Sequence, residues 1–209
     1  MKFFIIGANG RIGKELCNDL LEKGHVVTAA ARHFEQLDDL KGLTKVKLDL
    51  NDNAQAIAKT MTANPDVIYF VAGSRGNDLL NIDTYGAVKS MQAAEINHIK
   101  RFVMLSGYGS LTPSFWEQTS LKEYYTAKYF ADNWLISNTN LDYTILQPGT
   151  LTEKPLTGKV SLNTSEAGEN SIKDVAAVLA AIPEHKNTNK KIISMHDGST
   201  PIDEALKEV

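Results

Sequence analysis

Short apolar runs alternate along the chain with stretches whose apolar residues recur at helical spacing. The apolar runs have the length of strands and contain few polar residues, which is typical of strands covered on both faces. The predicted strands are Lys2–Ile6, Val26–Ala31, Val46–Leu48, Val67–Val71, Arg101–Leu105, Tyr143–Leu146 and Lys191–Met195. Strands that alternate with helices form βαβ units, so the pattern predicts an α/β domain whose parallel sheet lies between two layers of helices.

The helices are predicted from apolar spacing together with the residues that start and stop helices. In the first helix Ile12 and Leu16 share one face, and Gly24 supplies a C-terminal stop. Two Ser-x-x-acid sequences, beginning at Ser120 and Ser171, have the spacing of capping boxes. The predicted helices cover residues 11–23, 51–61, 83–98, 120–137 and the stretch from 171 to Pro183, with Asn51 or Asp52 as the cap of the second.

Residues 151–170 break this alternation and are rich in Thr, Gly and Ser. In open α/β sheets, ligands bind at the carboxyl ends of the strands, so this segment is interpreted as a small substrate cap above that edge. A chain of 209 residues is long enough for one well-buried domain. The expected organisation is therefore a single domain over residues 1–209 with a minor C-terminal cap.

Composition and charge exclude several classes of function. Apolar residues make up 43% and charged residues 22% of the chain, which are ordinary values for a globular domain. The net charge of -3 provides no basic surface for nucleic acid or an anionic membrane, and no apolar run approaches the ~20 residues of a membrane span. A strand that begins at Lys2 and a lone Cys17 indicate a cytoplasmic protein without leader peptide or disulfide. The five histidines show no metal-ligand spacing, so no metal site is expected.

The first predicted strand runs directly into a glycine-rich turn that opens the first helix. Gly7 can adopt the positive φ of a tight turn, Gly10 lets the backbone approach a pyrophosphate, and Gly13 lets the helix lie close to the strands. The free N–H groups and the positive dipole end of the helix then face the phosphate. A turn without ligand is the alternative, but three glycines in this context favour a dinucleotide. The loop residues expected at the cofactor are Gly7, Asn9, Gly10, Arg11, Ile12 and Gly13.

The G-x-x-G-x-x-G spacing resembles that of the short-chain dehydrogenase/reductase superfamily, in particular its extended and atypical branches. A second motif of that superfamily, Tyr-x-x-x-Lys, occurs at Tyr124 and Lys128 on the helix after the fifth strand. The segment Gln147–Leu151 is similar to the Arg-Pro-Gly-x-Leu sequence at the sixth strand, with Gln147 in place of arginine. The resemblance spans nearly the whole chain and implies a doubly wound Rossmann fold with strand order 3-2-1-4-5-6-7.

The end of the second strand distinguishes NAD from NADP in dinucleotide folds. An acidic side chain there binds the ribose hydroxyls of NAD, whereas a cation accommodates the 2′-phosphate of NADP. This chain has Arg32 at that position, and a planar guanidinium suits a phosphate. Arg11 in the glycine-rich turn is a second candidate for the same group. NADP is therefore the expected cofactor, with NAD as the alternative if Arg32 is only a solvated charge.

The resemblance implies further contacts with the cofactor. An aspartate–apolar pair after the third strand holds the adenine edge, and small residues after the fourth strand lie beside the phosphate and ribose next to the nicotinamide. The turn after the sixth strand passes over the nicotinamide. The contacts implied in this way are Asp49, Leu50, Val71, Ala72, Gly73, Lys128, Pro148, Gly149, Thr150 and Leu151.

The spacing of Tyr124 and Lys128 also carries a chemical argument. Residues four apart on a helix share one face, with Cβ atoms about 5–6 Å apart. A tyrosine hydroxyl can donate a proton to a carbonyl oxygen that receives hydride, and a nearby ammonium lowers the pKa of the phenol. The alternative is that Tyr124 packs and Lys128 pairs with Asp132. In the superfamily a serine after the fifth strand completes the catalytic set; Ser106 is the candidate here, although Tyr108 falls at that position in another alignment.

The motifs together predict an NADP-dependent oxidoreductase that transfers hydride to a small carbonyl, quinone or flavin-like acceptor. A non-catalytic NADP(H) sensor is the first alternative, because the serine position is ambiguous. A nucleotide-sugar epimerase or dehydratase is the second, and it is disfavoured because few residues remain for a sugar-binding domain. Residues 107–119 are rich in aromatic and apolar side chains, and they are compatible with a substrate lid, a packed loop or an oligomer contact. The expected partner is a small-molecule substrate, and the sequence leaves monomer and homodimer open.

Overall fold

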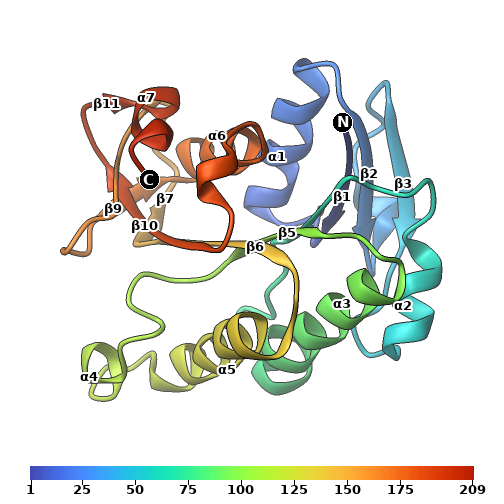
Figure 1. Ribbon diagram of the computed structural model, residues 1–209, viewed down its shortest axis with the longest axis horizontal. Coiled ribbons are helices and arrows are strands. Elements are labelled where there is room, and N and C mark those ends of the chain that lie inside the picture. The colour runs from blue at the N-terminus through green and yellow to red at the C-terminus, as the bar shows by residue number, and fades with distance from the viewer.

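The computed structural model describes all 209 residues, and its central element is a nine-stranded sheet (Figure 1). The strands are β1 (Lys2–Ile6), β2 (Val26–Ala31), β3 (Leu43–Lys47), β4 (Val67–Phe70), β5 (Arg101–Leu105), β6 (Asp142–Pro148), β7 (Thr150–Thr152), β8 (Lys159–Leu162), β9 (Glu169–Ser171), β10 (Lys191–Asp197) and β11 (Thr200–Pro201). The helices are α1 (Arg11–Glu22), α2 (Ala54–Thr60), α3 (Tyr85–Ile96), α4 (Pro113–Trp116), α5 (Lys122–Asn138), α6 (Ile172–Ala181) and α7 (Ile202–Lys207). A π-helical turn, Leu79–Thr84, leads into α3, and short 3-10 turns cover Phe34–Gln36, Ile182–Glu184 and Lys186–Thr188.

The parallel part of the sheet has the order β3-β2-β1-β4-β5-β6-β10, which confirms the predicted doubly wound arrangement. β1 lies between β2 and β4, so the chain reverses its direction of winding next to the first strand. Such a switch point creates a crevice at the carboxyl ends of the strands. The structure adds β8 and β11, which pair antiparallel at the edge beyond β10.

Successive residues of β1 point to opposite faces of the sheet and enter two apolar layers. Phe3 and Ile5 belong to the layer that includes residues of α1 and α6, whereas Phe4 and Ile6 belong to the layer that includes residues of α2, α3 and α5. Figure 1 shows the same division, with α1 and α6 on one side of the sheet and α2, α3 and α5 on the other. Helices therefore cover both faces, and the loops at the strand ends are left to form the site.

The third strand begins earlier than predicted, at Leu43 rather than Val46, and ends at Lys47. It is the edge strand of the parallel sheet and pairs only with β2. None of its residues is fully buried, so its apolar signal in the sequence is weak. An edge strand keeps one side in solvent, which is the physical reason for the misplaced boundary.

Two of the predicted helix starts are wrong. Asn53 caps α2, with its side chain accepting a hydrogen bond from the third backbone N–H of the helix at 2.9 Å, so neither Asn51 nor Asp52 is the cap. α5 begins at Lys122 after Leu121, without any side-chain cap, so the capping box that starts at Ser120 does not form. Both starts lie within a few residues of the prediction because apolar spacing locates a helix better than it locates the first residue.

The second capping box is also absent, although its helix begins as predicted. Ser171 precedes α6, but its hydroxyl donates to the Lys154 carbonyl at 2.8 Å instead of capping the helix. The Asp174 carboxylate accepts hydrogen bonds from the backbone N–H groups of Thr157 and Gly158. Both side chains therefore hold the segment 154–158 in place, and tertiary contacts replace the local cap.

The segment 151–170 lies only in part outside the main sheet. β7 and β9 pair parallel as a separate two-stranded sheet, while β8 extends the main sheet antiparallel to β10. The central strand of the segment therefore belongs to the main sheet, and only β7 and β9 lie outside it.

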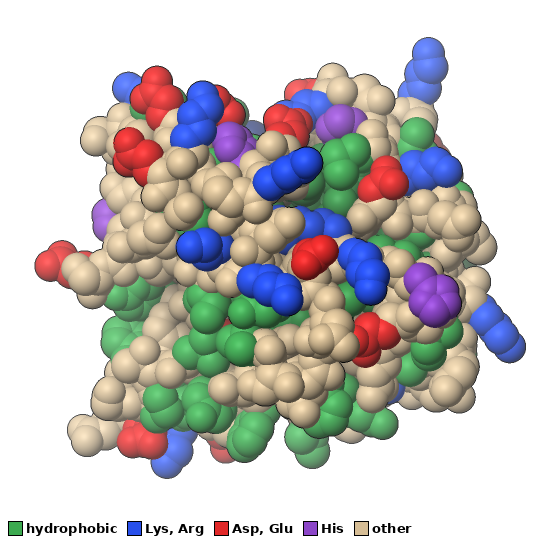
Figure 2. Space-filling model, in the orientation of Figure 1, with side chains coloured by type: hydrophobic (Ala, Val, Ile, Leu, Met, Phe, Trp, Pro, Cys, Tyr) green, Lys and Arg blue, Asp and Glu red, His purple; other side chains and the backbone are tan.

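The surface over α3 and α5 is apolar. Figure 2 shows hydrophobic side chains exposed in the lower part of the view, where Figure 1 places these helices. Tyr85, Phe130 and Trp134 are among the large side chains that remain exposed on them. None of the helices combines the length and the apolar character that crossing a membrane requires.

Candidate functional site

The glycine-rich turn after β1 has the conformation that its sequence predicts. Gly7 has φ +91°, and a Cβ there would lie 2.5 Å from the backbone nitrogen of Ala72. A Cβ on Gly13 would lie 2.8 Å from the Cα of Ala8, so glycine is needed for α1 to pack this closely against the turn. No side chain caps α1 at Gly10, and the first turn contains no acidic residue. The N–H groups of the helix start are therefore available to an anion.

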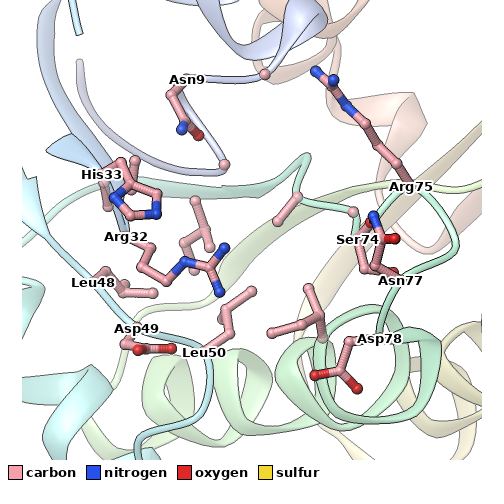
Figure 3. A pocket seen from close by; sticks show the side chains of 18 residues that line it. Asn9, Arg32, His33, Leu48, Asp49, Leu50, Ser74, Arg75, Asn77 and Asp78 are labelled. Atoms are coloured by element: carbon pink, nitrogen blue, oxygen red, sulfur yellow. The ribbon is translucent and has the colours of Figure 1, made fainter. Parts of the chain in front are cut away.

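This turn forms one wall of a pocket of about 330 Å³, which we call the outer pocket (Figure 3). The remaining walls come from the residues that follow β2, β3 and β4. The predicted cofactor residues that line the outer pocket are Gly7, Asn9, Gly10, Arg32, Asp49, Leu50, Ala72 and Gly73.

A second cavity of about 460 Å³, the inner cleft, lies between the glycine-rich turn, α5 and the turn after β6. The predicted residues that line it, apart from those it shares with the outer pocket, are Arg11, Ile12, Val71, Ser106, Tyr124, Lys128, Pro148, Gly149, Thr150 and Leu151. Gly10, Ala72, Gly73 and Arg75 line both cavities. The two cavities therefore adjoin along the carboxyl edge of the sheet, and together we call them the groove. Of the predicted residues, Gly13 alone lines neither cavity, because it serves the packing of α1.

Two arginines that were expected at the same phosphate lie apart. Arg32 is exposed, forms no ion pair or hydrogen bond within the chain, and extends into the outer pocket in Figure 3. Arg11 lines the inner cleft instead, and its guanidinium pairs with Glu153 at 2.9 Å. The structure therefore does not bring Arg11 and Arg32 together: they line different cavities, and Arg11 is paired with Glu153.

Arg75 is a cation of the groove that the sequence analysis missed. It has φ +55°, forms no ion pair, and borders both the outer pocket and the inner cleft. In Figure 3 it lies across the pocket from Arg32. The only sequence signal is its place directly after the small-residue loop that follows β4. The groove therefore offers two unpaired guanidinium groups, Arg32 and Arg75, for phosphate.

Asp49 and Leu50 form the wall of the outer pocket opposite the glycine-rich turn. The Asp49 carboxylate accepts hydrogen bonds from the backbone nitrogen of Asn51 at 2.9 Å and from its side-chain nitrogen at 3.0 Å. Lys89 donates to the Leu50 carbonyl. Burial lowers the pKa of Lys89, while the carboxylates of Asp49 and Asp52 act in the opposite direction. Contacts from α3 and from the turn itself thus fix this wall in place.

Tyr124 and Lys128 face the inner cleft from α5. The Lys128 ammonium lies 5.7 Å from the centroid of the Tyr124 ring and donates to the Leu105 carbonyl at 3.2 Å. The Tyr124 hydroxyl makes no hydrogen bond within the chain, and a Cβ on Gly107 would lie 3.5 Å from it. The sequence left open that Lys128 pairs with Asp132, but in the structure these two side chains form no ion pair and Lys128 bonds to the Leu105 carbonyl. The cleft therefore contains an unengaged phenol hydroxyl beside a positive charge.

Ser106 borders the inner cleft, but its hydroxyl belongs to a buried polar cluster. It donates to Oδ2 of Asp132 at 2.7 Å, and Ser110 donates to the same oxygen at 2.5 Å. Gln147 donates to the Ser110 hydroxyl at 2.8 Å. Burial raises the pKa of Asp132 to about 6, although the hydrogen bonds from both serines act in the opposite direction. Ser106, Tyr124 and Lys128 thus all line the inner cleft, but the Ser106 hydroxyl is hydrogen-bonded to Asp132 and makes no hydrogen bond to Tyr124.

The aromatic segment 107–119 supplies the wall of the inner cleft that faces away from the glycine-rich turn. Tyr108 and Phe115 line the cleft, while Trp116 is buried behind them.

Asp83 also lines the cleft, although no motif in the sequence indicated it. Its carboxylate accepts a hydrogen bond from the Ser74 backbone N–H at 2.9 Å. Nothing local marks Asp83 as a site residue, because the π-helical turn that positions it has no clear sequence signal.

Comparison with known proteins agrees with this geometry. Residues 7–186 match the family described as NAD(P)H-binding. The chain is 38% identical, over the full length of both proteins, to the "Uncharacterized sugar epimerase YhfK" of Bacillus subtilis. It is 33% identical to the "UPF0659 protein YMR090W" of Saccharomyces cerevisiae, over 100% of this chain and 99% of the yeast protein. The crystal structure of the oxidoreductase ylbE from Lactococcus lactis superposes with a TM-score of 0.97 at 42% identity, over 100% of this chain and 96% of that one.

These matches confirm the resemblance that the glycine-rich turn and the Tyr-x-x-x-Lys motif indicated. The matched residues, 7–186, include the glycine-rich turn and also the residues after it that line the groove. The names of the relatives include both an oxidoreductase and an epimerase. The relatives therefore share a fold that binds NAD(P)H, but their names do not agree on one reaction. The chain therefore belongs to the NAD(P)H-binding family of Rossmann-fold proteins, whose members here are oxidoreductase- and epimerase-like.

Proposed function

We propose that this protein is an NADP-dependent oxidoreductase that reduces a small carbonyl, quinone or flavin-like acceptor. One observation carries the proposal: the outer pocket, with the uncapped helix start and an unpaired Arg32, adjoins the inner cleft that holds Tyr124 and Lys128. A dinucleotide needs phosphate contacts in the middle of such a groove, and hydride transfer needs an acid at its inner end.

The residues of the groove fit a nicotinamide dinucleotide. Gly10 has no side chain, so a phosphate can approach its backbone directly; a Cβ there would lie 3.2 Å from the Gly7 carbonyl oxygen. The start of α1, which no side chain caps, lies beside it. Asp49 and Leu50 would hold the adenine end, and Lys128 with the backbone of residues 149–151 would hold the nicotinamide end. When bound, a reduced nicotinamide supplies the hydride.

The protein's own contribution to the reaction is a positioned proton donor. In the proposal the Tyr124 hydroxyl protonates the oxygen or nitrogen of the acceptor as charge develops there. The Lys128 ammonium, 5.7 Å from the centroid of the Tyr124 ring, lies close to the negative charge that this proton transfer would leave. The carbonyl of Leu105 holds that ammonium in place, so the acid and its activating charge are fixed before substrate binds.

The proposed preference for NADP rests on Arg32. Its guanidinium has no partner within the chain and extends into the outer pocket, where a 2′-phosphate would supply a partner. A chain specific for NAD would be expected to place a carboxylate at the end of β2, and this chain has none there.

Two observations favour other functions. The engagement of Ser106 with Asp132 removes one member of the usual catalytic set, which favours an NADP(H) sensor. The name of the Bacillus subtilis relative favours epimerisation, but most of the chain after Thr150 builds sheet and covering helices, so little of it is available for a nucleotide sugar.

The proposal is tested by following NADPH oxidation, by its absorbance, against a panel of small carbonyls, quinones and free flavins. We expect turnover with at least one acceptor and none without protein. Tight NADPH binding without turnover on any acceptor contradicts the enzyme and supports the sensor. Interconversion of a nucleotide sugar without net NADPH oxidation supports the epimerase instead.

A further inference from the structure

We propose that the inner cleft binds its acceptor as a planar conjugated ring, such as a quinone or an isoalloxazine, against an aromatic wall. This inference rests on the proposed function and narrows its acceptor to one chemical class. The aromatic wall consists of Tyr108, Phe115, Tyr124 and Tyr125, which all line the inner cleft.

The four rings of the aromatic wall contact one another in a continuous series. The Phe115 ring lies 5.4 Å from the Tyr108 ring at 76° and 6.0 Å from the Tyr125 ring at 89°. Tyr125 in turn lies 5.3 Å from the Tyr124 ring at 76°. These are edge-to-face arrangements, the geometry that aromatic rings prefer. A further ring would find both faces and edges available within the same cleft.

Buried contacts hold the aromatic wall from behind. Trp116 stacks on Tyr125 at 6.1 Å and 9°, and its indole nitrogen donates to the Ser110 carbonyl at 3.0 Å. Gly109 has φ +71°, and a Cβ there would lie 2.6 Å from the Phe115 ring. The loop therefore requires glycine so that the Phe115 ring can pack on its backbone. A wall built in this way is preorganised, which lowers the cost of binding a rigid ring.

Lys128 lies at the aromatic wall, with its ammonium 5.7 Å from the centroid of the Tyr124 ring. The other charged residues that line the cleft are Arg11, Arg75 and Asp83, and none of them belongs to the segment 107–119 that supplies Tyr108 and Phe115. Phe115 keeps 41% of its surface exposed, although a large apolar side chain gains from being covered. A sugar or a carboxylic acid would find no charged side chain beside Tyr108 and Phe115 from the segment 107–119, and the Lys128 ammonium already donates to the Leu105 carbonyl. A conjugated ring would instead cover Phe115 and contact the tyrosines.

The reduction balances with the groups at hand. The acceptor ring gains a hydride and one proton from the Tyr124 hydroxyl, which converts a quinone to a hydroquinone or an isoalloxazine to its dihydro form. Two electrons leave the nicotinamide, which becomes oxidised. Tyr124 regains its proton from solvent through the open mouth of the cleft. No further oxidant, reductant or metal is needed.

The test measures ring binding to the full chain saturated with NADP⁺, using lumiflavin and menadione as probes in calorimetric titrations. Phe115→Ala should weaken the binding of either probe about tenfold or more, because it removes the central ring of the wall. Phe115→Leu keeps an apolar side chain in the loop and should weaken binding nearly as much. The matched control is Phe130→Ala, which truncates an exposed phenylalanine on α5 that does not line the cleft; it should leave binding unchanged.

The outcomes separate this inference from the proposed function. If NADP⁺ binds but neither probe does, or if Phe115→Leu binds the probes like wild type, the aromatic acceptor is wrong and the oxidoreductase stands. Faster turnover of a small aliphatic dicarbonyl than of either ring also overturns it. If NADP⁺ itself fails to bind, the proposed function fails first. Stronger binding of menadione than of lumiflavin would identify the quinone as the acceptor source, and the reverse order would identify the flavin.

Discussion

Arg32 has no partner within the chain although it lies among the walls of the outer pocket. We expect an unpaired guanidinium at this point to contribute to cofactor affinity chiefly when the cofactor carries a 2′-phosphate. The residue is exposed, so solvent screens the contact, and a charge-assisted pair of this kind contributes about 1.5 kcal/mol, at the low end of its usual range.

Arg32→Ala should therefore weaken NADP⁺ binding roughly tenfold and leave NAD⁺ binding within a factor of about two. Calorimetric titration of both cofactors measures the difference. Arg75→Ala is the matched control, because Arg75 borders both cavities and should weaken the two cofactors alike. Equal losses for both cofactors in the Arg32 variant would show that this side chain does not bind the 2′-phosphate.

Tyr124→Phe removes a hydroxyl that has no structural partner, so the fold and the cofactor affinity should remain. If the hydroxyl is the acid, kcat should fall by roughly 10²–10⁴-fold on the best acceptor. Tyr125→Phe, on the adjacent residue of the aromatic wall, serves as the control and should have little effect on kcat. Full activity of the Tyr124 variant would mean that the proton comes from solvent.

Lys128→Met should reduce both cofactor affinity and kcat, because one ammonium is expected to serve the nicotinamide end and the Tyr124 phenol. Its side chain is buried against β5, and methionine retains much of its length, so folding should survive. Unchanged cofactor affinity together with unchanged kcat would exclude Lys128 from the site.

At the scale of elements, Asp132 connects α5 to the loop after β5. Its Oδ2 accepts hydrogen bonds from the hydroxyls of Ser106 and Ser110, which both lie in that loop, while its Oδ1 is buried without a partner. The sequence could not show this contact, because the residues are far apart in the chain and meet only in the folded protein. The place of Ser106 after β5 makes it a catalytic candidate, and in the folded chain its hydroxyl also fixes the loop that carries Tyr108.

The buried carboxyl of Asp132 should make stability depend on pH. Its folded pKa, about 6, lies above the ordinary value of 3.8, so the folded state holds a proton that the unfolded state releases between about pH 4 and 6. The free energy of unfolding should thus fall as pH rises through this window, by up to about 3 kcal/mol. Asp132→Asn stays neutral and should flatten that part of the profile in denaturant titrations at several pH values.

Asp19 on α1 provides the comparison for this profile. Burial and the neighbouring carboxylates of Glu15 and Glu22 also raise its pKa to about 6, so it contributes a fall in the same window. Asp19→Asn should therefore also flatten this part of the profile, and the double variant should flatten it more than either substitution alone. A pH profile identical in wild type and Asp132→Asn would contradict the raised pKa.

Across the whole molecule, the sequence predicted the parallel sheet because most of its strands are buried on both faces and read as apolar runs. It missed β8 and β11, which are short and partly polar and lie at the edge of the sheet. Such strands are defined by their pairing with β10 and with each other, and pairing leaves little trace in local composition.

The site shows the same division. Residues tied to a local motif, such as Gly7, Tyr124 and Lys128, lie in the groove as the sequence predicted. Arg75 and Asp83 were missed because a left-handed loop residue and a π-helical turn place them there. The direction of a side chain, which separates Arg11 from Arg32, also depends on the folded arrangement of α1 and β2.

The central claim is that the groove binds NADP(H) through the uncapped start of α1. The most direct test is calorimetric titration of NADPH into wild type and Gly10→Glu, with circular dichroism to establish that the variant is folded. A carboxylate at this position would repel the pyrophosphate, and Gly10 has an ordinary φ of −74° that other residues adopt. We expect one NADPH bound per chain in wild type and no measurable binding to a folded Gly10→Glu. Equal NADPH affinity in the two proteins would contradict the central claim.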